Sequence, residues 1–183
     1  MLKIRFLFPC AITFILTAIV ALIQPARGLE GVVVPINLTA TNGVGASVGA
    51  ITLHNSQYGL LLTPDLRGLA PGLHGFHVHQ NPDCGPSQKD GAIVPGLAAG
   101  GHFDPTQTSR HEGPYGEGHL GDLPPLYVGH DGVANVPILA PRLAVSDIWS
   151  HSLMIHDGGD NFSDNPTPLG GGGARSACGV MKY

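Results

Sequence analysis

Histidine is concentrated in one stretch of the chain, because six of its ten histidines lie between His74 and Asp122. His77 and His79 are separated by one residue. On a strand, whose side chains alternate with a period of two, they would share one face. Neutral imidazole is the commonest metal ligand among side chains. Two imidazoles side by side make half of a metal site.

A second set of candidate ligands follows in a segment rich in glycine and proline, which indicates a loop. The set has three imidazoles and one carboxylate: His102, His111, His119 and Asp122. Zinc prefers four tetrahedral ligands of these kinds, and a loop can turn all four inward. We therefore predict a closed, structural zinc site. A single histidine is more often a core or surface residue, but the clustering favours metal binding over that alternative.

The N-terminus has the pattern of a secretory signal from Met1 to Gly28. Lys3 and Arg5 supply a positive start, residues 6–23 are almost wholly apolar, and Ala26 and Gly28 offer small residues at positions minus three and minus one for cleavage. The alternative is an uncleaved membrane anchor, because the apolar run is long and Arg27 is unusual beside a cleavage site.

The remaining residues, 29–183, suit one domain with its own core. The whole chain has a net charge of −4; removing residues 1–28 takes three of nine basic residues and none of 13 acids, which leaves −7. Such an acidic protein is not expected to bind nucleic acid. Two cysteines remain, Cys84 and Cys178, and an even count in an exported chain predicts one disulfide. Two free thiols are the alternative, which an oxidising compartment disfavours.

The hydrophobic pattern predicts short strands only. From Val32 to Thr41 apolar residues alternate with more polar ones, as in a half-buried strand. Further strands are expected at 48–54, 60–63, 74–79, 126–128, 133–139, 153–156 and 178–181, with a short helical turn at 145–150. Strands so closely spaced cannot be parallel with helical crossovers. We predict an all-β, antiparallel sandwich or barrel, and we interpret the glycine run 170–173 as flexible chain.

Four motifs closely resemble the copper/zinc superoxide dismutase family, in its bacterial secreted (periplasmic) branch. They are Gly75-Phe76-His77-Val78-His79, Gly101-His102-Phe103-Asp104-Pro105, His119-Leu120-Gly121-Asp122 and Gly173-Ala174-Arg175-Ser176-Ala177-Cys178-Gly179-Val180. The resemblance covers nearly all of the chain after residue 28. It implies an eight-stranded Greek-key sandwich or barrel with long metal-binding and active-site loops, which is the known architecture of this family.

The resemblance also implies two metal sites that share one ligand, His102. The copper ligands would be His77, His79, His102 and His156, and the zinc ligands His102, His111, His119 and Asp122. Asp160 would accept hydrogen bonds from one ligand of each metal and so fix the ring orientations. Cys84 and Cys178 would form the disulfide that ties the loop before the zinc ligands to the last strand.

The implied activity is that of an exported antioxidant enzyme that dismutes superoxide. Zinc is redox-inert, so copper must exchange the electrons. The resemblance implies that one superoxide reduces Cu(II) and leaves as oxygen, and that a second oxidises Cu(I) and leaves as hydrogen peroxide. One proton is assigned to His102, which detaches from Cu(I). Arg175, beside the copper, and Lys89, from the loop 86–90, would attract the anion.

Two rival functions follow from the same residues. A copper-binding or copper-delivery protein on this scaffold would bind metal without turnover, whereas a zinc hydrolase would need an open zinc position and a general base. The other histidines are expected to be structural or surface residues: His54, His74, His130 and His151. The sequence leaves open whether the apolar loop Gly91 to Ala99 packs or forms a contact surface. It also leaves open a monomer or a homodimer, and a periplasmic or extracellular location.

Overall fold

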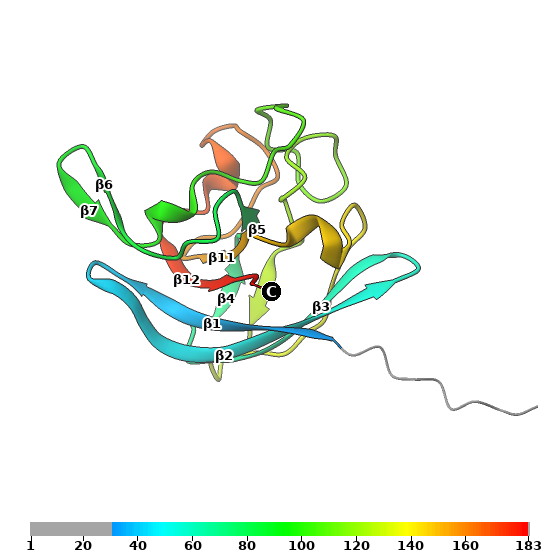
Figure 1. Cartoon of the computed structure of the whole chain (residues 1–183), viewed down its shortest axis with the longest axis horizontal. Coiled ribbons are helices and arrows are strands. Elements are labelled where there is room, and N and C mark those ends of the chain that lie inside the picture. The colour runs from blue at the N-terminus through cyan, green and yellow to red at the C-terminus, as the bar shows by residue number, and fades with distance from the viewer. Residues whose placement is uncertain (1–30, 183) are drawn as a thin grey trace, which may run out of the picture.

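The computed structural model describes residues 31–182, and antiparallel strands make up almost all of its regular structure (Figure 1). The main sheet has eight strands in the order β10, β3, β2, β1, β12, β11, β5, with β9 paired to β3. These are β1 Val32–Ala40, β2 Gly43–Ser56, β3 Gly59–Arg67, β5 Phe76–His79, β9 Val133–Ala134, β10 Ile138–Ala140, β11 Ser152–His156 and β12 Arg175–Val180. The sheet is curled, and the long loops gather above it on the side of β5 and β11 (Figure 1). The expected all-β antiparallel class is confirmed.

Two small sheets and three short 3-10 helices complete the structure. β4 Gly72–His74 pairs with β8 Leu126–Val128, and β6 Ser87–Lys89 pairs with β7 Ala92–Val94 as a projecting hairpin (Figure 1). The 3-10 helices are η1 Leu97–Ala99, η2 Val145–Ile148 and η3 Leu169–Gly171. Among residues 31–182, no helix has the length and apolar character needed to cross a membrane.

The first strand shows how the hydrophobic pattern places a residue inside or outside. In β1, Val34 and Ile36 are buried, whereas Val33, between them, is 59% exposed. Ile51 and Leu53 of β2 lie beside them on the inner face and are fully buried. The alternation predicted from the sequence therefore forms one wall of the core.

The core fills the space that the curled sheet encloses. Its largest fully buried side chains come from strands and loops far apart in the chain: Phe76, Ile36, Ile51, Leu53, Leu60, Leu62, Leu66, Leu123, Leu126, Ile148, Leu153 and Met154. Phe76 and Leu153 belong to β5 and β11, which also carry histidines. Apolar packing therefore fixes the strands on which the candidate ligands lie.

Two predicted strands are each divided into two in the structure. The strand expected at 74–79 is two strands, because the backbone of Gly75 leaves the ladder to donate to Gly158 O (2.7 Å) while β4 pairs elsewhere, with β8. The strand expected at 133–139 is likewise two, β9 and β10, each paired with a different part of β3. The glycine run 170–173 is not loose chain, because Gly170 is buried and lies in η3.

Candidate metal centre

The segment from His102 to Asp122, which precedes β8, is fastened to β5 near both of its ends by backbone hydrogen bonds. Val78 N donates to Gly121 O (2.8 Å), and Phe103 N donates to Val78 O (2.8 Å). These bonds create two isolated bridges, His77 with Asp122 and His79 with His102. Residues from three distant places in the sequence thus meet beside one short strand.

The side chains there form two overlapping groups of metal donors, each with its donor atoms within 4.8 Å of one another. The first group is His77, His79, His102 and His156; the second is His77, His102, His111 and Asp122. All of these residues are buried. Imidazole suits both copper and zinc, and a carboxylate suits zinc, so the residues present fit the two metals.

On the first side, backbone carbonyls decide which nitrogen of each ring is free. His79 directs Nδ1 to Gly100 O (3.0 Å), and His156 directs Nδ1 to Gly173 O (3.3 Å). Their Nε2 atoms then face each other, 3.4 Å apart. Because a hydrogen bond at one ring nitrogen leaves the other for a metal, His79 and His156 would use Nε2 as the ligand atom.

On the second side, three rings converge on one carboxylate. Asp122 Oδ1 lies 2.9 Å from His102 Nδ1 and 3.4 Å from His119 Nδ1, and its Oδ2 lies 3.0 Å from His111 Nδ1. In the described part of the chain, His77, His111 and His119 each bury an Nδ1 atom with no hydrogen-bond partner. Buried polar atoms are normally satisfied, so these orphaned nitrogens point to a ligand that completes them.

Asp160 joins the two sides. Its carboxylate accepts hydrogen bonds from His77 Nε2 and His111 Nε2, each at 2.8 Å, which leaves Nδ1 of both rings for metals. Gly170 makes room for this carboxylate, because its φ is +71° and an added Cβ would lie 2.1 Å from Asp160 Oδ1. The glycine therefore meets both a conformational and a steric requirement.

Burial keeps the histidines of the first group neutral. Desolvation, aided by the charge that His102 can carry, lowers the pKa of His77 to about 3, and burial likewise lowers the pKa of His156 to about 4. The pKa of His79 is also lowered, first by burial and then by His102 and Arg175. Neutral imidazoles have the lone pair that a metal requires.

His111, in the second group, behaves differently because it faces two carboxylates. Burial opposes a charge on His111, but Asp122 and Asp160 outweigh it and raise the pKa of His111 to about 9. The pKa of each carboxyl group is lowered, since bonds to the rings, from His102 first for Asp122 and from His111 first for Asp160, overcome the burial that would raise it. In metal-free protein, zinc must therefore displace a proton from His111.

An open cavity of about 250 Å³ leads to the first group. Its lining includes His79, His102 and His156, together with the basic residues Lys89 and Arg175. Arg175 begins β12 opposite His156 in β11, at a register shift between the two strands. The cavity can therefore admit a small anion toward the imidazoles.

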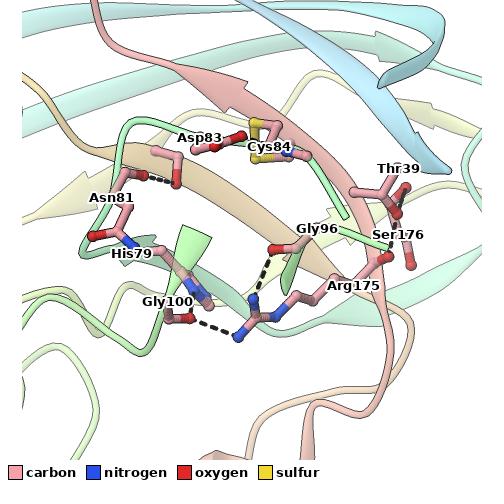
Figure 2. Close-up of a disulfide and its surroundings, with 12 residues drawn as sticks. Thr39, His79, Asn81, Asp83, Cys84, Gly96, Gly100, Arg175 and Ser176 are labelled. Atoms are coloured by element: carbon pink, nitrogen blue, oxygen red, sulfur yellow. Dashed lines mark hydrogen bonds between the residues drawn. A yellow bond between two sulfur atoms is a disulfide. The ribbon is translucent and has the colours of Figure 1, made fainter. Parts of the chain in front are cut away.

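Backbone carbonyls hold the Arg175 guanidinium in place. Its two terminal nitrogens donate to Gly96 O (2.7 Å) and Gly100 O (2.6 Å), as Figure 2 shows beside His79. Partial burial lowers the pKa of Arg175, which stays far above neutrality because guanidinium does not titrate in proteins. The predicted anion guide is thus a fixed positive charge.

The disulfide predicted between Cys84 and Cys178 is present, with an S–S distance of 2.01 Å (Figure 2). It connects the segment after β5 to β12. Hydrogen bonds from Asn81 N to Ala99 O (2.9 Å) and from Ala98 N to Gly85 O (3.1 Å) extend the attachment toward Gly100. The covalent link therefore supports the segment whose carbonyls hold Arg175.

Other predicted residues lie outside the two donor groups. His119 lies beside Asp122 and the rings of His102 and His111, but the second group contains His77 where the sequence predicts His119. His74 is buried with its ring nitrogens 2.6 and 2.7 Å from carbonyl oxygens, as a structural residue would be. His54, His130 and His151 are absent from both groups.

One contact was not anticipated. Asp164 accepts hydrogen bonds from the backbone N–H groups of His111 (2.9 Å) and Leu169 (3.0 Å). These bonds connect residues 104–125, here called the zinc-side loop, to residues 157–173. These bonds lower the pKa of Asp164. Its only sequence signal is a place in an Asp- and Asn-rich turn, which does not reveal backbone partners so distant.

The fold and the site define a class: an antiparallel, all-β protein with two overlapping groups of buried metal donors that share His77 and His102. A family model described as copper/zinc superoxide dismutase matches residues 47–181. The chain therefore belongs to the copper/zinc superoxide dismutase family. Its predicted family, enzyme class and metals are confirmed, whereas the alternative of a copper-delivery protein gains no support from its relatives.

Relatives and solved structures agree with this membership. A copper/zinc superoxide dismutase of Actinobacillus pleuropneumoniae is 60% identical over 137 residues, covering 74% of this chain and 72% of the relative. That of Haemophilus parainfluenzae is 51% identical and covers 100% of both chains. The Brucella abortus enzyme structure matches with a TM-score of 0.81 at 50% identity, over 83% of this chain and 99% of the other. The monomeric enzyme of Salmonella enterica matches at 0.75 and 53% identity, with the same coverage.

Proposed function

We propose that this chain is an exported superoxide dismutase with copper held by His77, His79, His102 and His156, and zinc held by His102, His111, His119 and Asp122. The observation that carries the proposal is the placement of His102. Its buried ring belongs to both donor groups, and its Nδ1 lies on the Asp122 side, which leaves Nε2 for the other group. His77 also belongs to both groups, but its Nε2 is occupied by Asp160.

When bound, copper supplies the one-electron redox chemistry and zinc supplies a structural charge beside it. Arg175 binds and orients superoxide in the cavity, because its guanidinium is fixed by two carbonyls and keeps further N–H donors. Lys89 attracts the anion from the cavity wall. His102 holds a proton at Nε2 in one half of the cycle and delivers it in the other.

The two rivals lack a supporting observation in this site. A zinc hydrolase needs an open metal position, whereas the four proposed protein ligands would close the zinc. A copper-delivery protein needs neither a guided anion nor an arginine held beside the imidazoles. The carbonyl contacts of Arg175 and the open cavity therefore favour turnover over delivery.

The decisive experiment measures metal content and superoxide dismutation on the purified domain of residues 29–183. We expect one copper and one zinc per chain and a rate that disappears when copper is removed. Protein that binds both metals without activity would contradict the enzyme and favour delivery. Ester or phosphoester hydrolysis that depends on zinc alone would favour the hydrolase.

We also propose that residues 1–28, which lie outside the described residues, direct export to the periplasm and are removed there. The disulfide supports an exported protein, because reducing compartments disfavour such bonds. Mass spectrometry of the protein isolated from a periplasmic fraction should find Leu29 at the N-terminus. An intact N-terminus in a membrane fraction would instead indicate a retained anchor.

The Salmonella enterica structure is described as monomeric, which favours a monomer here as well. Analytical ultracentrifugation of the metal-loaded domain tests this state. A concentration-independent monomer is expected, and a dimer at micromolar concentration would contradict it.

A further inference from the structure

Arg142, which is not one of the proposed ligands, donates to four carbonyl groups of the zinc-side loop. It lies just after β10, and its guanidinium donates through all three nitrogens. Nε donates to Pro114 O (3.0 Å) and Nη1 to Gly118 O (3.1 Å). Nη2 donates to Gly113 O (3.1 Å) and to His119 O (2.6 Å).

The loop needs such a partner because it has no secondary structure of its own between residues 104 and 125. Outside a helix or sheet, backbone carbonyls must find other donors. Within this loop, His119 N donates to Arg110 O (2.9 Å) and Asp122 N donates to His119 O (3.3 Å), but the carbonyls of Gly113, Pro114 and Gly118 accept from Arg142. A planar guanidinium with five donors can gather several carbonyls at a fixed spacing, which no other side chain does.

The charge of Arg142 has no carboxylate partner. Between residues 31 and 182, the arginines in ion pairs are Arg67 with Asp65 and Arg110 with Glu112. Arg142 instead makes charge-assisted hydrogen bonds to neutral carbonyls, which are stronger than bonds between neutral groups. The contacts therefore organise the backbone and do not neutralise an acid.

We propose that Arg142 is a positioning residue for zinc: it holds the backbone of residues 113–119 so that His119 stays against Asp122. The proposal rests on the proposed zinc ligands and concerns a residue that is not one of them. His119 is the member of the set with the weakest hold in the metal-free protein, since its Nδ1 lies 3.4 Å from Asp122 and has no hydrogen bond. The 2.6 Å bond to its own carbonyl is the nearest restraint outside the loop.

Charge and position predict opposite effects on zinc affinity. A permanent positive charge near a dication repels it, so a purely electrostatic role predicts tighter zinc binding when Arg142 is neutralised. A positioning role predicts weaker binding, because the loop must then be ordered at the moment of binding. Contacts equally strong with and without zinc would alter stability but leave affinity unchanged.

The test compares Arg142→Gln and Arg142→Lys with the control Arg110→Gln. The control removes an exposed charge from the zinc-side loop but leaves the hydrogen bonds between Arg142 and the loop carbonyls intact. Zinc dissociation constants are measured by chelator competition on metal-free protein of residues 29–183, with copper affinity as the internal reference. We expect Arg142→Gln to weaken zinc about tenfold, in the range of residues that orient metal ligands. Arg142→Lys should fall between it and wild type, and Arg110→Gln should be unchanged or slightly tighter.

Cobalt(II) bound in place of zinc gives a second readout. Its visible absorption should shift or weaken in Arg142→Gln and stay as in wild type in Arg110→Gln. Zinc affinity within twofold of wild type, with only a lower melting temperature, would overturn the proposal, as would equal losses in Arg110→Gln. If Arg142→Gln does not fold, Arg142→Lys decides by the same criteria. Failure of wild-type protein to bind zinc would instead refute the proposed ligands.

Discussion

Removing the disulfide by replacing Cys84 and Cys178 with serine should destabilise the protein and also slow anion capture. The bond closes a loop with a sequence separation of 94. In the chain-entropy account, opening such a loop increases the conformational entropy of the unfolded chain and so lowers the free energy of unfolding by about 4.7 kcal/mol. For a chain of this size, about 4.7 kcal/mol corresponds to a fall of roughly 10–20 °C in melting temperature.

The kinetic effect follows from the segment that the bond supports. The carbonyls of Gly96 and Gly100 fix Arg175, and both lie in the segment that follows Cys84 (Figure 2). Without the bond, this segment can move away from β12, and the guanidinium loses its position above the copper-side histidines. We expect a lower rate of superoxide consumption at unchanged copper content.

The assay is urea unfolding of metal-free protein, which separates the disulfide from metal linkage. Wild type reduced with a thiol serves as the control and should match the double serine variant. A loss of less than about 1 kcal/mol would refute the argument from the unfolded state. A full loss of stability with an unchanged rate would instead refute the link between the disulfide and Arg175.

Three further predictions concern metals, salt and pH. His77→Ala should abolish turnover and lower copper occupancy while zinc stays bound, whereas Asp122→Ala should release zinc and keep most copper; elemental analysis of both variants checks this, and equal loss of zinc would show that His77 serves both sites. Raising the ionic strength past about 0.1 M should slow the wild-type enzyme, because salt screens the attraction between the anion and the basic residues. Arg175→Ala should lower the rate and weaken its salt dependence, and Lys89→Ala should do both to a smaller extent. An unaltered salt dependence in Lys89→Ala would show that Lys89 does not attract the anion. Metal-free protein should be most stable near pH 6.5, measured by melting temperature across pH. Stability falls from there toward pH 3, because His77 binds a proton in the unfolded chain but stays neutral when it is buried in the folded protein. Stability also falls as the pH rises toward 9, because His111 then loses the proton that it keeps in the folded protein.

The sequence predicts best where one side chain carries the signal. The alternation in β1 predicts its buried face, and the spacing of His77 and His79 predicts that the two lie together in one donor group, which His156 joins as the family resemblance implies. It predicts poorly where backbone groups decide the structure. The break at Gly75 follows from a hydrogen bond to Gly158 O, and nothing in the pattern of side chains indicates that bond.

The misread features have the same physical origin. The hairpin β6–β7 is largely exposed, so it has no hydrophobic period to detect. The glycine run predicts flexible chain at Gly170, but in the structure this glycine leaves the space that the Asp160 carboxylate occupies. Arg142 gave no signal at all, since its four partners are carbonyl oxygens that every residue type carries. Such roles become visible only when distant backbone segments are placed in space.

The position of β12 in the main sheet governs when this protein can fold. β12 lies between β1 and β11, and Asn37 pairs with Cys178 across almost the whole chain. Contacts of such sequence separation must wait for the C-terminus, and folds dominated by them form slowly, in about milliseconds to seconds. Neither the sheet nor the disulfide can close while the chain is still being made. A chain that cannot complete its barrel early can still pass unfolded through a narrow translocation channel, so slow closure is compatible with the proposed export.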